Sequence, residues 1–276
     1  MRLRLWQVDA FARHVFEGNQ AAIVPLESWL ADATMQAIAE ENNLAETAFF
    51  VHRNGPDYDL RWFTPAVEVP MCGHATLASA WVIFSEIVPE LAQVRFATKS
   101  GTLTVEKSAD GHHRMALPAG VAEPLLVGGF GMSLGQALSV SPPEELYLAP
   151  TGAGGTRGVI AIWPESVLRD LKLSDALAPL LARAKAGGLL ATAKSQSADY
   201  DFVSRFFAPG MGIAEDPVTG SMHATLAPFW AARLGKPELR AYQASPRGGT
   251  LRCKVENTHV TLSGPCVLYL KGEIEI

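Results

Sequence analysis

Two tight turns, each leading directly into a helix, constrain this 276-residue chain more than any other feature. Residues 70–74 read PMCGH and continue as ATLASAW, and residues 216–221 read DPVTGS and continue as MHATLAPFW. Pro and Gly favour turns, whereas the Ala- and Leu-rich continuations favour helix. Because a helix start carries unpaired N–H groups and about half a positive charge, each turn can bind an anion such as a carboxylate.

The two predicted helices share a run of sequence. HATLA begins at His74 and again at His223, an offset of 149 residues, and a Trp follows both copies at the same spacing. Matching His74 with Thr219 instead, through the glycine turns, gives an offset of 145 residues, and both registers stay open at this point. An element repeated about half a chain apart predicts two halves of one architecture, with chance similarity between helix-forming sequences as the alternative.

Short strands outnumber helices along the rest of the chain. Alternating apolar and polar residues predict strands, for example at residues 3–11 and 101–106. Helices are predicted at residues 28–41, 165–171 and 176–186. Because strands and helices do not alternate one for one, the pattern favours an α+β protein over a doubly wound parallel sheet.

Two smaller patterns are interpreted as surface features. Residues 128–131, GGFG, are predicted to form a turn, since no clear strand precedes them as a nucleotide-binding loop requires. His112 and His113 follow the turn residues Asp110 and Gly111, so solvated side chains are predicted here in preference to metal ligands.

Composition excludes several classes of protein. The net charge of −5 without a basic cluster predicts no nucleic-acid partner. No apolar run reaches transmembrane length, and the first residues lack the apolar core of a signal peptide, so we expect a cytoplasmic protein without a membrane partner. Three cysteines, an odd number, predict no disulfide framework. Zinc-hydrolase and Walker motifs are absent from the sequence, so neither a metal nor a nucleotide cofactor is predicted.

An acidic residue, Glu46, stands at the head of a predicted strand at residues 44–51, LAETAFFV. Its sequence neighbours Leu44, Ala48 and Phe49 are apolar. One interpretation is a solvent-facing side chain at a helix–strand junction. The other is a carboxyl group partly removed from water and suited to proton transfer.

Several polar residues gather at the two turns. Cys72 stands at a helix start, where a thiolate is stabilised, although a small buried side chain is the alternative. His74 follows it, while Asp216 precedes a proline and Ser221 stands where a helix N-cap is expected. If the two halves face each other, these groups can hold a carboxylate while Glu46 moves a proton.

At these residues the sequence resembles the phenazine-biosynthesis isomerase family (PhzF-like), whose members have the diaminopimelate-epimerase fold. The resemblance covers nearly the whole chain through ordered motifs: QVDAF at 7–11, GNQAA at 18–22, NLAETAFF at 43–50, RWFTP at 61–65, EVPMCGHATLASA at 68–80, RFFAP at 205–209, GIAEDPVTGSMHATLAPFW at 212–230 and QASPRGG at 243–249.

The resemblance implies two similar domains, each a curved and mostly antiparallel sheet wrapped around a central helix. The first domain is expected at residues 1–117, with strand 267–276 returning to it, and the second at residues 118–266. The active site is expected in the cleft between them. The resemblance also implies a homodimer, a small carboxylate substrate, and neither a cofactor nor a metal.

The resemblance also implies roles for individual residues. Glu46 matches the general acid/base. His74, Asp216 and Ser221 match the polar residues that hold the substrate and assist proton transfer. The substrate-binding positions are Gly73, Gly220, Asn19 and Thr219.

The reaction implied by the resemblance is a cofactor-independent isomerisation of a small cyclic or unsaturated carboxylic acid, as in the isomerisation of a dihydro-hydroxyanthranilate. One alternative is an amino-acid racemase, epimerase or dehydratase that uses Cys72 as its single thiol. A two-thiol racemase of this fold is disfavoured, since Pro217 and Val218 stand where the second cysteine belongs. The other alternative is a binding protein that holds a carboxylate metabolite without turnover.

Overall fold

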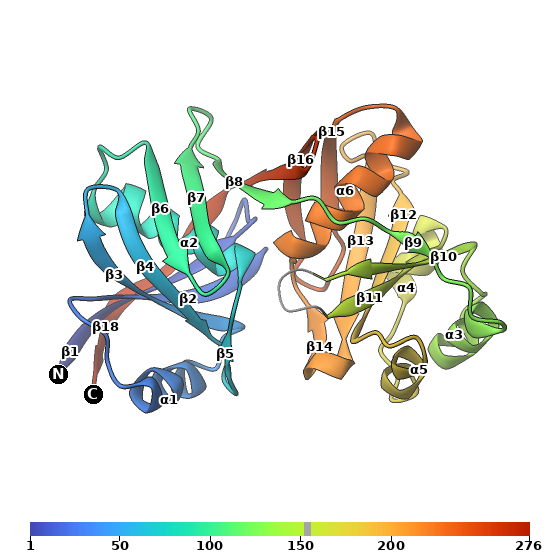
Figure 1. Cartoon of the computed structure of the whole chain (residues 1–276), viewed down its shortest axis with the longest axis horizontal. Coiled ribbons are helices and arrows are strands. Elements are labelled where there is room, and N and C mark those ends of the chain that lie inside the picture. Colours follow the sequence, from blue (N-terminus) through green and yellow to red (C-terminus); the bar gives the residue numbers. More distant parts are fainter. Residues whose placement is uncertain (152–155) are drawn as a thin grey trace. The chain divides into compact units, whose positions relative to one another are not determined.

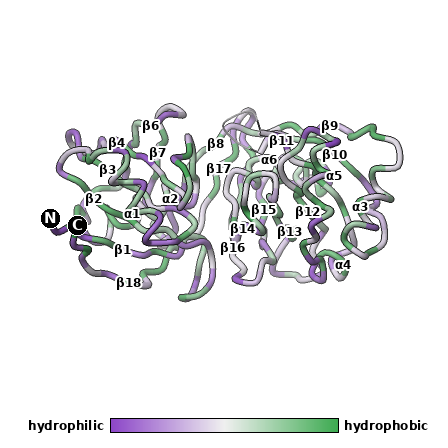
Figure 2. The backbone as a smooth tube through the Cα atoms, turned by 90° about the horizontal axis from the view of Figure 1, so that it is seen from below, coloured by the Kyte–Doolittle hydropathy of each residue, from purple (hydrophilic) through white to green (hydrophobic). Residues whose placement is uncertain are grey.

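The structure, a computed structural model, describes residues 1–151 and 156–276. The chain divides into two compact units, the first comprising Met1–Ala116 with Leu262–Ile276 and the second Leu117–Thr261. Figure 1 shows strands gathered around one helix in each unit, α2 in the first and α6 in the second. Figure 2 colours the backbone by hydropathy and shows hydrophobic stretches within both units.

The first unit is built from strands and two α-helices. Its strands are β1 (Arg2–Ala10), β2 (Asn19–Leu26), β3 (Glu46–Asn54), β4 (Asp57–Phe63), β5 (Glu68–Val69), β6 (Gln93–Thr98), β7 (Gly101–Lys107), β8 (His113–Pro118) and β18 (Cys266–Glu275). Its helices are α1 (Asp32–Asn42) and α2 (Gly73–Val82), and a π-helical turn, η1 (Ile83–Ile87), directly follows α2. The C-terminal strand β18 pairs antiparallel with β1.

The second unit contains more helix. Its strands are β9 (Glu123–Pro124), β10 (Glu145–Pro150), β11 (Arg157–Ile162), β12 (Gly188–Lys194), β13 (Phe202–Ala208), β14 (Ile213–Asp216), β15 (Glu238–Gln243), β16 (Gly249–Glu256) and β17 (His259–Gly264). Its helices are α3 (Phe130–Leu138), α4 (Glu165–Asp170), α5 (Leu177–Arg183), the 3₁₀ turn η2 (Pro209–Met211) and α6 (Gly220–Leu234).

One order of strand pairing occurs in both units. In the first, β1–β2 is antiparallel, β2–β3 parallel, β3–β4 antiparallel, β4–β6 parallel and β6–β7 antiparallel. In the second, the same succession joins β10, β11, β12, β13, β15 and β16. In each unit the central helix connects the strands of the second parallel pair. The predicted α+β fold of two similar, mostly antiparallel domains is confirmed.

Helix α2 forms the core of the first unit. Every residue from Gly73 to Ala80 is buried, so the helix has no polar face directed at solvent in this stretch. A helix that is apolar all round must be covered on all sides, and α2 contacts β1, β2, β3, β7 and β18. Its buried hydroxyl groups remain satisfied, because Thr76 and Ser79 each donate to a backbone carbonyl four residues earlier.

Three local predictions were wrong in whole or in part. The helix predicted from residue 28 begins at Asp32, because Ala31 takes the extended backbone of an N-cap residue. The turn predicted at residues 128–131 is confirmed at Gly128 and Gly129, but α3 begins at Phe130 and has a buried face that includes Leu134. A buried side chain every fourth residue was the signal for this helix.

The third error concerns the histidine pair beside the turn at residue 111. His113 is buried in β8 and stacks on the Phe84 ring, with ring centroids 5.5 Å apart. Its position follows from strand alternation, because His113, Met115 and Leu117 face inward while the residues between them face outward. Among the described residues, no helix is long and apolar enough to span a membrane.

Candidate active site

The start of α2 carries the first group of predicted site residues. Cys72 is the N-cap residue and has an extended backbone (φ −144°, ψ 112°), Gly73 is the first helical residue and His74 the second. The Thr76 hydroxyl donates to the Cys72 carbonyl at 2.5 Å, and the Thr76 N–H donates to the same oxygen. These two bonds therefore hold the turn before α2 to the first turn of the helix.

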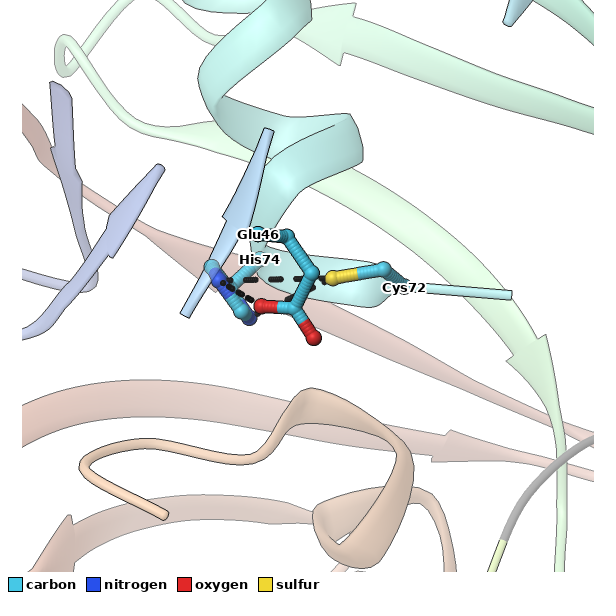
Figure 3. A group of neighbouring side chains, drawn as sticks. All are labelled: Glu46, Cys72 and His74. Atoms are coloured by element: carbon cyan, nitrogen blue, oxygen red, sulfur yellow. Dashed lines mark hydrogen bonds and ion pairs between the residues drawn. The ribbon is translucent and has the colours of Figure 1, made fainter. Parts of the chain in front are cut away.

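Glu46 and His74 meet at this helix start. Glu46 is the first residue of β3, and its Oε2 lies 3.0 Å from His74 Nε2. The Glu46 side chain is 14% exposed and that of His74 6%, so the pair is largely removed from water. Figure 3 shows Glu46, Cys72 and His74 pointing toward one another. The structure thus places Glu46 as a mostly buried carboxyl rather than a solvent-facing one.

Two further side chains contact the other ring nitrogen of His74. Asn19, the first residue of β2, is buried, and its Nδ2 lies 3.2 Å from His74 Nδ1. Cys72 Sγ lies 3.5 Å from the same nitrogen. The Asn19 amide can serve both forms of the ring, since its nitrogen can donate to neutral imidazole and its oxygen can accept from imidazolium. The structure therefore brings together Asn19, Glu46 and His74, with Cys72 as a fourth member.

The protonation states of this group follow from burial and charge. Burial works to lower the pKa of His74, but Cys72 and Glu46 act in the opposite direction, and the net effect raises its pKa well above the usual value. Burial, with the Glu46 charge, raises the pKa of Cys72 to about 11. At neutral pH the Cys72 thiol is therefore protonated and a thiolate at this helix start is not favoured, so the Glu46 charge is what favours a proton on His74.

This group is also spaced so that it could bind a metal ion. Glu46, Cys72 and His74 each offer one ligand atom, and these atoms lie within 4.8 Å of one another. A thiol binds metal as the thiolate, so a metal ion bound here would displace the proton of Cys72. The spacing of these three atoms thus fits a metal ion as well as proton exchange among the three groups.

The start of α6 carries the second group. Thr219 is the N-cap residue, again extended (φ −116°, ψ 99°), and Gly220 and Ser221 are the first two helical residues. The expectation that Ser221 is the N-cap was therefore wrong, because the chain leaves the extended conformation two residues earlier. Asp216 ends β14, and the Thr219 hydroxyl donates to its Oδ2. One turn thus carries Asp216, Thr219, Gly220 and Ser221.

The two helix starts define the register of the repeat. Gly73 and Gly220 are each the first helical residue, which gives an offset of 147 residues, and neither 145 nor 149 is correct. In this register His74 corresponds to Ser221. Thr76 corresponds to His223, and the two have the same role: His223 Nδ1 donates to the Thr219 carbonyl at 2.8 Å, as the Thr76 hydroxyl does to that of Cys72.

Sequence reasoning missed the side chains that brace these turns. Arg61 forms two 2.8 Å bonds to the Glu68 carboxylate. Arg205 forms the equivalent pair to Glu215 at 2.7 and 2.8 Å. The Arg61 bonds lower the pKa of Glu68 to about 2. The signal was present in the sequence, since R-x-F-x-P followed by E-x-P-x-x-G occurs once in each half.

A serine completes each brace. Ser100 Oγ donates to the Pro70 carbonyl at 2.8 Å, and Ser245 Oγ donates to the Pro217 carbonyl at the same distance. Pro70 and Pro217 are also 147 residues apart, like the glycines that follow them. Both turns are therefore held at the same backbone oxygen by a hydroxyl from a later segment.

Among the described residues of the second unit, a glycine stands where the first unit has Glu46. Glu46 faces Ala21 in the first pair of the parallel β2–β3 ladder. Gly188 faces Gly158 in the first pair of the β11–β12 ladder. A side chain added at Gly188 would meet the Phe206 ring at 2.5 Å, so an aromatic ring occupies the space next to this backbone.

Comparison with known proteins identifies the family. A family model described as phenazine biosynthesis-like protein, PhzC-PhzF, matches residues 8–272. The chain belongs to the PhzC-PhzF family. "Uncharacterized isomerase PA2770" of Pseudomonas aeruginosa is 46% identical to it, with both chains covered completely. The human phenazine biosynthesis-like domain-containing protein is 37% identical over 99% of each chain.

Solved structures agree with this family assignment. A PhzF-family protein of Enterococcus faecalis superposes with a TM-score of 0.88 and 39% identity over the whole of both chains. A probable proline racemase of Agrobacterium radiobacter has a TM-score of 0.64 at 11% identity, with 99% of this chain and 92% of that chain covered, and shows the fold alone. The PhzF family and its epimerase-like fold support an isomerase or epimerase role for this chain.

Proposed function

We propose that this protein is a cofactor-independent isomerase that moves a proton between two carbons of a small cyclic or unsaturated carboxylic acid. The observation that carries the proposal is the 3.0 Å contact between the Glu46 carboxylate and the His74 imidazole, both largely buried at the start of a helix. A carboxylate held beside an imidazolium and removed from bulk water can take a proton from carbon and return it.

Each residue of the first group has a role in this proposal. Glu46 acts as the general base and then as the general acid. His74, whose raised pKa keeps it cationic, holds the Glu46 carboxylate in place and favours negative charge that develops on the substrate. Asn19 contacts the ring of His74 at Nδ1, and Gly73 lets a substrate carboxylate approach the N–H groups of α2.

Asp216, Ser221 and Gly220 stay predictions from the resemblance to the family. Asp216 and Ser221 are proposed as catalytic residues, and Gly220 as a substrate-binding position. The same holds for the homodimer, which sedimentation or native mass measurement of the pure protein tests directly.

The test is a proton NMR time course in D₂O with trans-2,3-dihydro-3-hydroxyanthranilic acid, the substrate that the family resemblance implies. Wild type is expected to convert it with uptake of solvent deuterium. Glu46→Gln is expected to lose a factor of about 10² to 10⁴ in rate, the typical contribution of general acid/base catalysis. Glu106→Gln, which alters an exposed carboxylate that pairs with Arg114, is the matched control and keeps wild-type turnover.

The outcomes separate the alternatives. Turnover by Glu46→Gln at the wild-type rate contradicts the role of Glu46. If wild type stabilises on adding the acid but no deuterium enters it, the protein is a binding protein for this ligand. If wild type neither converts nor binds it, other small carboxylic acids are screened for deuterium uptake in the same way.

One observation favours a second candidate, a racemase, epimerase or dehydratase that uses Cys72. Its Sγ lies 3.5 Å from His74 Nδ1, within reach for proton exchange. The pKa of about 11 argues against a thiolate at neutral pH. Cys72→Ser decides between the candidates: the Glu46 proposal expects a small change in turnover, and the Cys72 candidate expects its loss.

A further inference from the structure

Gln243, the last residue of β15, is a buried amide directed at the turn before α6. Its Oε1 accepts the Thr219 N–H at 2.9 Å. Its Nε2 donates to the Asp216 carbonyl at 2.7 Å and to Thr219 Oγ1 at 3.3 Å. The orientation of the amide is determined by these contacts, because only its oxygen can accept from an N–H and only its nitrogen can donate to a carbonyl.

The bonds of the Thr219 hydroxyl have a direction. Because Oγ1 accepts from Gln243, its single proton points elsewhere, and it is donated to Asp216 Oδ2. Hydrogen bonds therefore run from Gln243 through Thr219 to the Asp216 carboxylate. A carboxylate oxygen that accepts such a bond is held in one orientation, and bonds to charged acceptors are stronger than those between neutral groups.

We propose that Gln243 and Thr219 are positioning residues that orient the Asp216 carboxylate for proton transfer. This inference rests on the proposed function, in which Asp216 is catalytic. It replaces the substrate-binding role predicted for Thr219, whose only hydroxyl proton is already donated within the turn. Each unit then directs a buried amide at its own catalytic group, Asn19 at His74 and Gln243 through Thr219 at Asp216.

Four variants test the proposal. Thr219→Val keeps the shape of the side chain and removes the hydroxyl, Thr219→Ser keeps the hydroxyl, and Gln243→Leu removes the amide. Ser245→Ala is the matched control, because it removes a 2.8 Å bond to the same turn, at the Pro217 carbonyl, and leaves the Gln243–Thr219–Asp216 series intact.

A loss of orientation should appear in kcat rather than in KM, since misplacement of a catalytic group by about 1 Å can cost up to about 100-fold in rate. Thr219→Val and Gln243→Leu are expected to lower kcat at least about 10-fold with KM within about twofold. Thr219→Ser is expected to recover most of the rate, and Ser245→Ala to lose less than about threefold. Wild-type kcat in Thr219→Val overturns the proposal.

Amide hydrogen exchange provides a readout that needs no substrate. Since the Thr219 N–H donates to Gln243, its exchange in Gln243→Leu is expected to be at least about 10-fold faster than in wild type. In Thr219→Val the same N–H keeps its bond to Gln243 and exchanges at the wild-type rate. If wild type converts no acid, the proposed function fails, whereas unchanged exchange at residue 219 in Gln243→Leu shows instead that the amide does not hold the turn.

Discussion

The starts of α2 and α6 are built to one plan and carry different chemistry. Both have an extended N-cap residue, a glycine at the first helical position and a side chain four residues after the cap that donates to the cap carbonyl. Both are braced by an Arg–Glu pair and by a serine bound to a proline carbonyl. At the second helical position, however, His74 contacts an acid, and Ser221 takes its place in the other unit.

This comparison separates two kinds of residue. Side chains that shape the backbone recur in both units, whereas side chains that can act on a ligand differ. The two histidines of HATLA show the distinction, because His74 is the partner of a carboxylate while His223 holds a carbonyl and a serine hydroxyl. The HATLA sequence that both halves share therefore indicates a shared backbone arrangement. The residue at the second position of each helix, by contrast, indicates which chemistry that helix start can carry.

The largest expected effect is on the free energy of unfolding, through the Arg–Glu pairs that brace the two turns. Arg205 also donates to the Leu168, Arg169 and Leu171 carbonyls at the end of α4, and its side chain is 8% exposed. Arg205→Ala leaves a nearly buried carboxylate unpaired and is expected to cost about 3–5 kcal/mol in unfolding free energy.

The matched variant in the first unit is Arg61→Ala. Arg61 is 18% exposed, and Lys99 still pairs with Glu68 after its removal, so about 1–3 kcal/mol is expected. Denaturant unfolding of both variants measures the difference. Equal losses would show that the two braces are energetically equivalent despite their unequal burial.

The next largest effect is expected at the second position of each central helix, where His74 stands in α2 and Ser221 in α6. His74→Ser places at α2 the residue that stands at the corresponding position of α6, and it is expected to lower turnover about 10²- to 10³-fold, since the partner of Glu46 is lost. Ser221→Ala is expected to lower turnover less, by about 10-fold or below. Steady-state kinetics compares the two, with thermal unfolding as the control for folding. A larger loss in Ser221→Ala would reverse the assignment of the principal acid/base group to the first unit.

The pKa values of the two HATLA histidines, His74 and His223, are expected to be shifted in opposite directions. Burial works to lower the pKa of His74, but its charged neighbour Glu46 helps to raise it overall, so its stabilising contribution is full below pH 6.5 and is lost as pH rises through its folded pKa. Burial lowers the pKa of His223 to about 4, so the unfolded chain binds more protons between pH 6.5 and 4.

Over that window His223 is expected to reduce the unfolding free energy by about 1.4 kcal/mol per pH unit as pH falls. Ring resonances followed by NMR from pH 4 to 8 test both signs. A His223 ring that titrates near 6.5 would contradict its placement as a neutral, buried hydrogen-bond donor.

The smallest expected effect lies away from both helix starts. Burial, with smaller contributions from Lys107 and His112, lowers the pKa of His113 to about 4, and both its ring nitrogens lack a hydrogen-bond partner among the described residues. His113→Leu is expected to stabilise the protein by about 1 kcal/mol at pH 7 and to flatten the loss of stability below pH 6.5. Thermal unfolding measures the change, and His112→Leu is the control. A destabilised His113→Leu would show that the imidazole shape is required beside Phe84.

Much of the fold could be predicted from the sequence, because strand alternation and the turn-to-helix elements are local signals. The α+β class and the pair of central helices follow from them. The start of α3 could not be predicted from the glycines, since a turn with a left-handed Gly129 forms whether or not a helix follows it. His113 was misplaced because polarity was weighed above the alternation of its strand.

The candidate site could be predicted only in part. Glu46 and His74 lie close together, but their contact joins the head of β3 to the start of α2, and no sequence spacing encodes that distance. The Ser221 cap was wrong by two residues, since Thr219 and Ser221 are both good caps and the backbone decides between them. The contacts of Gln243 depend on a strand that follows α6 and carry no local signature.

The glycine at the head of β12 has a consequence for how the two halves of the chain can evolve. The Phe206 ring occupies the space beside Gly188, so an acid introduced there would require a simultaneous change at a second, aromatic position. A single substitution at Gly188 therefore cannot give the second half the carboxylate that Glu46 provides in the first. The two halves therefore cannot be made alike at this position by one change, because the first holds a carboxylate there and the second an aromatic ring.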